Sequence, residues 1–177
     1  MRRLPYAPLA LAPLLLLAAC DTGGDGDDDG TIRRVLITEI TIDDAPLTAP
    51  DGGGWDNDIS GGGPDIYLEL VNDDTGSLVE SFQGNEFSNV DDQDFPLEYD
   101  LDTDPALDPI VFTRFNTPLA FDLYDEDPQL TKGEDDYMGS TEAFNLQELI
   151  DGGRPSFLRV ESTDGLITVS IRLRYES

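Results

Sequence analysis

The residues best placed to do chemistry are carboxylates gathered around a single loop late in the chain. They are Asp125, Glu126, Asp127, Glu134, Asp135 and Asp136. Carboxylates that converge on one point repel each other, and this repulsion raises their pKa values. A hard divalent cation removes the repulsion, and loops that present oxygen ligands are what Ca²⁺ binds in proteins. The sequence therefore predicts a calcium site in this loop.

The acidic loop lies between two segments that have the pattern of strands. Before it, residues 119–124 alternate in character, with Leu119, Phe121 and Leu123 on one face. After it, an apolar segment begins at Tyr137. These two predicted strands are the elements expected to position the carboxylates.

Composition narrows the classes of function. The chain has 177 residues, with 38 acidic against 10 basic residues, no histidine and a net charge of −28. Nucleic acid is not expected as a partner, because phosphate binding needs a basic surface. The lack of histidine excludes Ser-His-Asp and Cys-His catalysis and, with a single cysteine, disfavours zinc. The acidity also has a plainer explanation, because negative surface charge keeps proteins soluble.

The N-terminus has the features of a bacterial lipoprotein leader. Residues 1–19 combine a basic start with an apolar run that is too short and too proline-interrupted for a transmembrane helix. Leu17-Ala18-Ala19-Cys20 resembles a lipobox, which implies cleavage before Cys20 and attachment of lipid to that residue. The alternative is an ordinary signal peptide with a chance cysteine. The lipobox predicts a protein anchored to a membrane of the bacterial cell envelope, on its extracytoplasmic side.

Residues 20–31 are predicted to tether the lipid to a folded domain. Repulsion between aspartates and the freedom of glycine keep the sequence DTGGDGDDDG extended. It contains Asp25-x-Asp27-x-Asp29-Gly30, the opening of an EF-hand loop, but Leu36 stands where a bidentate glutamate is needed. We therefore interpret this stretch as a linker.

Two enzyme classes use only carboxylates. Asp-Thr-Gly, the aspartic-protease signature, occurs at 21–23 and 74–76. The first copy lies in the tether, the second follows the polar pair Asn72-Asp73, and the chain is too short for two protease lobes. A glycoside hydrolase needs two well-placed carboxylates, but no stretch combines them with aromatic platforms for sugar. We therefore do not expect an enzyme.

Residues 32–177 are predicted to form one all-β domain with one short helix at 145–150. Strands are predicted at 32–42, 66–71, 78–82, 95–101, 119–124, 137–144, 155–162 and 166–175. Residues 110–115 are either a half-buried strand or a packed connection. Thr163-Asp164-Gly165 predicts a hairpin turn between the last two strands. Eight strands and almost no helix predict an antiparallel β-sandwich.

The order of these features resembles that of a C2 domain, the calcium- and phospholipid-binding β-sandwich of signalling proteins. The family places one aspartate in a first loop and another directly before an aromatic-containing strand, as Asp58 and Pro64-Asp65-Ile66-Tyr67 do here. Its third binding loop has aspartates at alternate positions and one before an aromatic-apolar-glycine triplet. Asp125, Asp127 and Asp136-Tyr137-Met138-Gly139 match that pattern.

The resemblance covers residues 32–175 and implies an eight-stranded Greek-key sandwich with calcium ligands at one end. The implied ligands are Asp58, Asp65, Asp125, Asp127 and Asp136, with Asp56 and Asp135 as further candidates. One departure concerns lipid head groups. Where the family carries a polybasic strand, residues 67–82 contain no Lys or Arg.

Three other interpretations stay open. The aspartates could be solvated loop residues of an acidic protein. A carbohydrate-binding sandwich with structural calcium would need coplanar exposed aromatic rings, for which Trp55, Tyr67, Tyr99 and Tyr124 are the candidates. A calcium-stiffened adhesion module would bind a protein. Our expectation is a monomeric, lipid-anchored, non-enzymatic calcium-binding module that contacts a phospholipid membrane or a protein partner through its calcium loops.

Overall fold

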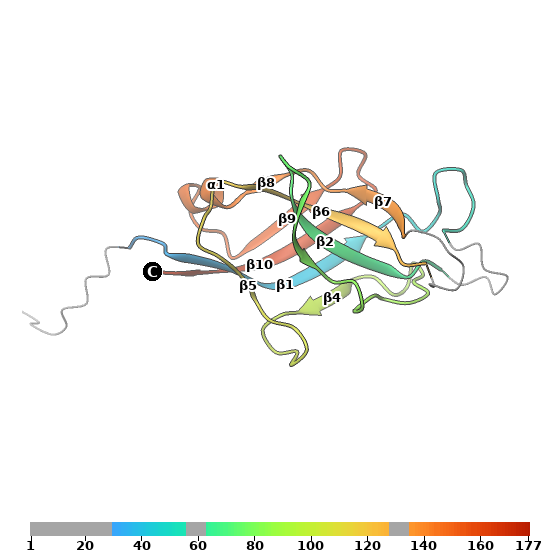
Figure 1. Ribbon diagram of the computed structural model, residues 1–177, viewed down its shortest axis with the longest axis horizontal. Coiled ribbons are helices and arrows are strands. Elements are labelled where there is room, and N and C mark those ends of the chain that lie inside the picture. Colours follow the sequence, from blue (N-terminus) through green and yellow to red (C-terminus); the bar gives the residue numbers. More distant parts are fainter. Residues whose placement is uncertain (1–29, 56–62, 128–134) are drawn as a thin grey trace, which may run out of the picture.

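The protein is a sandwich of two antiparallel sheets (Figure 1). The computed structural model describes residues 30–55, 63–127 and 135–177. Sheet A contains β1 (Arg34–Asp44), β4 (Leu97–Asp100), β5 (Ile110–Phe112), β9 (Phe157–Glu161) and β10 (Thr168–Glu176). Sheet B contains β2 (Ile66–Asn72), β3 (Ser77–Ser81), β6 (Pro118–Asp125), β7 (Asp136–Ser140) and β8 (Phe144–Asn145). The helix α1 (Leu146–Asp151) follows β8 directly.

The all-β prediction is confirmed, but the described part of the chain has ten strands where the sequence predicts eight. The difference arises because two strand positions are each shared by two short strands. In sheet A, β4 pairs with residues 39–42 of β1 and β5 with residues 35–37. In sheet B, β7 pairs with residues 122–125 of β6 and β8 with residues 118–119. Each sheet is therefore four positions wide.

The core lies between the sheets and follows from the alternation of apolar residues. In β6, Leu119, Phe121 and Leu123 are at most 1% exposed. In β10, the inward residues Val169 and Ile171 are equally buried. The predicted helix begins after Asn145, whose side chain accepts hydrogen bonds from the backbone N–H groups of residues 147 and 148. The predicted hairpin joins β9 to β10.

The predicted strand at 137–144 is interrupted. β7 ends at Ser140, and Thr141 turns its hydroxyl toward β6, where it accepts a hydrogen bond from the Phe121 N–H at 3.1 Å. The chain pairs with β6 again only at Phe144. Because of this interruption, residues 136–145 can pair with both ends of β6, in one register through β7 and in another through β8.

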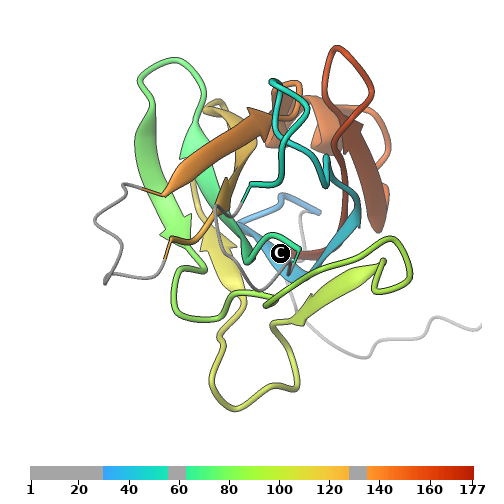
Figure 2. The same cartoon turned by 90° about the vertical axis from the view of Figure 1, so that its right-hand side faces the viewer.

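One end of the sandwich, which we call the acidic pole, is formed by the start of β2, the end of β6 and the start of β7. There Ile66 pairs with Asp125, and Asp125 pairs with Asp136. Figure 2 looks onto this pole. The chain enters the described domain at the other end, where the Arg33 N–H donates to the Glu176 carbonyl at 2.8 Å. Strand pairing thus fixes which loops share a pole.

Gly139 has a backbone conformation that residues with a side chain rarely adopt. Its φ of 142° lies in the positive region, and a Cβ atom there would come within 2.8 Å of the Cδ1 atom of Ile167. We expect Gly139→Ala to lower the free energy of unfolding by about 1–3 kcal/mol, measured by urea denaturation. Gly53→Ala is the control, because Gly53 has no positive φ and a Cβ there meets only the flexible Asp51 carboxylate. Equal stability of the two variants would contradict this role of Gly139.

Candidate metal centre

Asp125, the last residue of β6, ties two loops of the acidic pole together. Its side chain is fully buried. Its Oδ1 atom accepts a hydrogen bond from the Asp65 N–H at 2.7 Å. This contact spans 60 residues of sequence and joins the ends of two neighbouring strands. The sequence predicts a metal ligand at this position, and the structure adds a bond within the protein.

Asp65, which precedes β2, is held on both sides. Its backbone carbonyl accepts from the Glu126 N–H at 2.8 Å. Its Oδ1 atom accepts from the Asn89 N–H at 2.6 Å, and Asn89 has a φ of 54°. Asp65 therefore positions both the segment after β6 and the loop after β3.

Asp135 links three segments of the acidic pole. Its Oδ2 atom accepts from the Tyr67 hydroxyl and from the Gln83 side-chain amide, each at 2.8 Å. Its Oδ1 atom accepts from the Asp127 N–H at 3.3 Å. The neighbouring Asp136 is exposed at the start of β7. Five predicted ligand residues therefore lie at the acidic pole: Asp65, Asp125, Asp127, Asp135 and Asp136.

The carboxylates of the pole influence each other's protonation. Burial raises the pKa of Asp127, and the negative charges of Asp136 and Asp135 raise it further. Burial also raises the pKa of Glu126, and Glu86 adds the largest charge contribution, ahead of Asp135. These shifts are the signature of partly dehydrated carboxylates that face other carboxylates.

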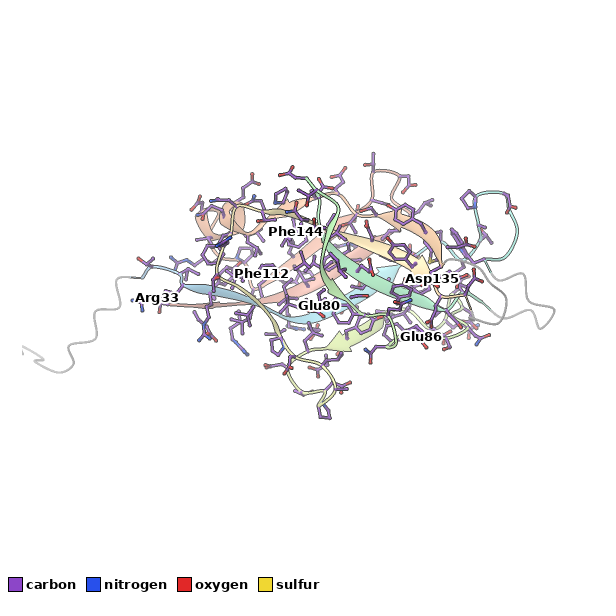
Figure 3. The ribbon with its side chains drawn as sticks, in the orientation of Figure 1. Arg33, Glu80, Glu86, Phe112, Asp135 and Phe144 are labelled. Carbon is purple, nitrogen blue, oxygen red and sulfur yellow. The ribbon has the colours of Figure 1, made fainter. Side chains whose placement is uncertain are left out.

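Glu86 is the residue that sequence reasoning missed, and Glu126 was named in the acidic loop but not among the candidate ligands. Their side chains lie within hydrogen-bonding reach of each other, and Figure 3 places Glu86 at the same end of the sandwich as Asp135. The Oε2 atom of Glu86 is buried, and no group in the described residues donates a hydrogen bond to it. Two carboxylates in this arrangement can share a proton or bind a cation between them.

The position of Glu86 depends on a contact that no local pattern announces. Phe87 and Ile66 exchange two backbone hydrogen bonds of 2.9 Å, which hold the loop after β3 against the start of β2. Residues 83–94 appear in the sequence only as a polar loop. Glu126 was left out of the ligand set because the C2 pattern has aspartates at alternate positions, and these are its neighbours Asp125 and Asp127.

Several predicted residues lie outside the described part of the chain. These are Cys20, Asp56 and Asp58, together with residues 128–134 of the acidic loop. Within 30–55, 63–127 and 135–177, no three carboxylates converge closely enough to hold a metal ion. In the same ranges, no helix is long and apolar enough to cross a membrane.

The aromatic residues named for sugar binding do not form an exposed platform. Trp55, Tyr67 and Tyr99 are buried. The Trp55 indole N–H donates to the Pro46 carbonyl at 2.6 Å, so this ring packs back on the domain. Tyr124 stacks against Tyr67 with an angle of 15° between the rings. Because the two rings stack on each other, their facing surfaces cannot stack on a sugar.

A scan against models of known protein families and a search of curated proteins found no match to this chain. The resemblance to C2 domains therefore stays a prediction made from the sequence.

The raised pKa values predict an unusual pH dependence of stability. The folded protein holds protons on Glu126 and Asp127 more tightly than the unfolded chain does, so without metal its stability falls as pH rises from the ordinary carboxyl pKa of about 4. We expect the melting temperature in chelator to rise as the pH is lowered from 7 to 5. Glu126→Gln should flatten this slope.

The control for the pH experiment is Asp73→Asn. Asp73 is exposed in the turn after β2, at the pole opposite Glu126, and the substitution removes the same charge. Equal slopes in the two variants would show that general charge repulsion, and not the acidic pole, sets the pH dependence.

Asp125 and Asp127 should differ in their importance for folding. Asp125→Ala removes the buried acceptor of the Asp65 N–H, and we expect it to lower the free energy of unfolding by about 1–3 kcal/mol without metal. Asp127→Asn should leave the unfolding midpoint unchanged or raise it slightly, because Asp127 lies half-buried at the rim and loses its repulsion with Asp136 and Asp135. Urea titrations in chelator measure both, and the reverse order would contradict this assignment.

Proposed function

We propose that this protein is a non-enzymatic calcium-binding module of C2 type, anchored through Cys20 to the extracytoplasmic face of a bacterial membrane. The observation that carries the proposal is that strand pairing and hydrogen bonds hold five of the predicted ligand aspartates at the acidic pole. Burial, and after it the neighbouring charges, raise the pKa values of Glu126 and Asp127 there. Five of the seven ligand candidates chosen from the sequence lie at this pole.

Physical chemistry supports a hard cation there. Dehydrated carboxylates that face one another cost free energy when all are ionised. A divalent cation offsets this cost, and Ca²⁺ accepts six to eight oxygen ligands in variable geometry. Asp65, Asp125, Asp127 and Asp136 would supply them, with Asp58 or Asp56 completing the set from the first loop. Extracytoplasmic calcium is plentiful, so weak affinity suffices.

The root of the proposed tether and the acidic pole lie at opposite ends of the domain. The chain enters the domain at Arg33, and β1 then runs 11 residues toward the acidic pole. At about 3.3 Å per residue this strand is roughly 35 Å long. The proposed calcium site is thus about one domain length from the root of the tether, where it can reach a phospholipid surface or a protein partner.

Calcium titration by calorimetry tests the proposal, using the Cys20→Ser protein without residues 1–19. We expect saturable binding, a higher melting temperature in calcium than in chelator, and no equivalent effect of magnesium. Asp127→Asn should weaken binding by about tenfold or more, because it removes a charged ligand at the rim. Fluorescence of Trp55, the only tryptophan, gives a second readout beside the predicted first-loop ligands.

Asp73→Asn is again the matched control and should bind calcium like the unmodified protein. No saturable binding, or the same affinity in the Asp127→Asn and Asp73→Asn variants, would show that the aspartates are solvated surface. The sandwich fold would then stand without a calcium function.

The anchor has its own test. The full chain produced in a bacterium should fractionate with membranes and carry lipid at Cys20, detected by mass spectrometry of the N-terminal peptide. Cys20→Ser should release the protein into the soluble extracytoplasmic fraction or leave it uncleaved. A Cys20→Ser protein that is cleaved and lipid-free and still fractionates with membranes would contradict anchoring through this residue.

A further inference from the structure

The outer face of sheet B carries a pair of like charges in its centre. Glu69 of β2 and Asp122 of β6 are direct cross-strand partners. Their neighbours Leu68 and Phe121 are fully buried in the core, so the two carboxylates lie on the opposite, solvent-facing side. Like charges directly opposite each other destabilise a sheet. A like-charge pair in the middle of a sheet suggests that a cation from outside the domain offsets the repulsion.

Sheet A shows how the same protein treats the equivalent position. There Glu39 of β1 is the cross-strand partner of Arg172 of β10, and the two form an ion pair of 2.8 Å. Arg34 and Glu176 form a second cross-strand pair at 2.5 Å. By contrast, the five strands of sheet B contain no Lys or Arg. Glu39 and Glu176 of sheet A therefore have basic partners, whereas among the described residues no Lys or Arg forms an ion pair with Glu69 or Asp122.

A row of tyrosines runs beside the Glu69–Asp122 pair. Tyr67 and Tyr124 stack with ring centres 5.3 Å apart, and Tyr124 meets Tyr137 edge to face at 5.5 Å. The row crosses the neighbouring strands β2, β6 and β7 (Figure 1). Tyr137, at its end, is 54% exposed. It therefore offers solvent an aromatic ring within electrostatic range of Asp122.

The charges and the rings act on each other. Burial raises the pKa of Tyr124, and the charges of Asp122 and Glu69 raise it further. Burial and Asp122 have the same effect on the pKa of Tyr137. Asp122 therefore lies within electrostatic range of both tyrosine hydroxyls, and the negative potential extends along the row.

We propose that this acidic and aromatic face of sheet B, formed by Glu69, Asp122, Tyr124 and Tyr137, binds a basic segment of a partner protein. A guanidinium or ammonium group would pair with the two carboxylates. Its flank would rest on the exposed Tyr137 ring, where the ring quadrupole attracts a cation. The net charge of −28 would steer such a segment toward the protein.

The chemistry favours an organic cation over a bare metal ion on this face. One oxygen of Glu69 already accepts a hydrogen bond from the Ser81 hydroxyl at 3.0 Å. An aromatic ring contributes nothing to the oxygen coordination that calcium requires, but it contributes directly to binding a side-chain cation. The face adjoins the acidic pole, since Tyr124 and Tyr137 form the pair next to Asp125 and Asp136. None of its four residues is a proposed calcium ligand, so its role does not require the calcium site.

An arginine-rich peptide is the probe, titrated against the chain without residues 1–19 in calcium and in chelator. We expect Asp122→Asn and Tyr137→Ala each to weaken binding by about fivefold or more, with and without calcium. Tyr137→Phe keeps the ring and should keep the affinity. Asp73→Asn, with the same charge change elsewhere, should alter the affinity by less than about twofold.

The outcomes separate specific docking from general attraction. Melting temperatures confirm that the variants fold, and Asp122→Asn tests the face if Tyr137→Ala does not fold. Equal weakening by Asp122→Asn and Asp73→Asn, or no effect of removing the ring, would overturn the proposal. Loss of peptide binding on addition of calcium would assign the binding to the acidic pole and would also overturn it. Failure of calcium to bind at all would leave this inference untouched.

Discussion

Repulsion between carboxylates at the acidic pole is the constraint on which the arrangement of the other parts depends. The seven-residue pairing of β2 with β6 brings Asp65 and Asp125 to the same end of sheet B. The Ile66–Phe87 bridge adds Glu86, and the β6–β7 pairing adds Asp136. Each pairing is held by the buried core below it. The core therefore supplies the stability that keeps these carboxylates close together. In a flexible chain their repulsion would drive them apart.

The sequence predicts the scaffold well because the scaffold depends on local alternation. The strand around Phe121, the hairpin at Thr163-Asp164-Gly165 and the short helix after Asn145 all lie where short-range patterns indicate them. The number of strands was wrong, because pairing of two short strands with different parts of one long strand is a long-range property. Thr141, which interrupts the strand by turning its hydroxyl toward β6, shows how a tertiary contact ends a locally favourable pattern.

The site is less predictable than the scaffold for the same reason. Asp65, Asp125 and Asp127 follow from their positions at strand ends, and the register of β2 and β6 brings them together. Glu86 comes from another loop, which the Ile66–Phe87 bridge and the bond from Asn89 to Asp65 hold beside Glu126. A count of aspartates also cannot tell a rim residue from Asp125, which is buried and bonded to the backbone of Asp65. Burial and bonding, not residue type, separate their roles.

The two sheets use their charges differently, and this difference bears on where partners would act. In sheet A, Arg34 and Arg172 lie opposite Glu176 and Glu39 and form ion pairs with them. In sheet B, Glu69 lies opposite Asp122, and the carboxylates of the acidic pole add more negative charge at the ends of the same strands. Cross-strand repulsion is modest for one exposed pair, so the core can hold it. The two proposed cations divide along these lines: a metal ion belongs to the loop oxygens of the acidic pole, and a side-chain cation to the Glu69–Asp122 pair beside the tyrosine rings.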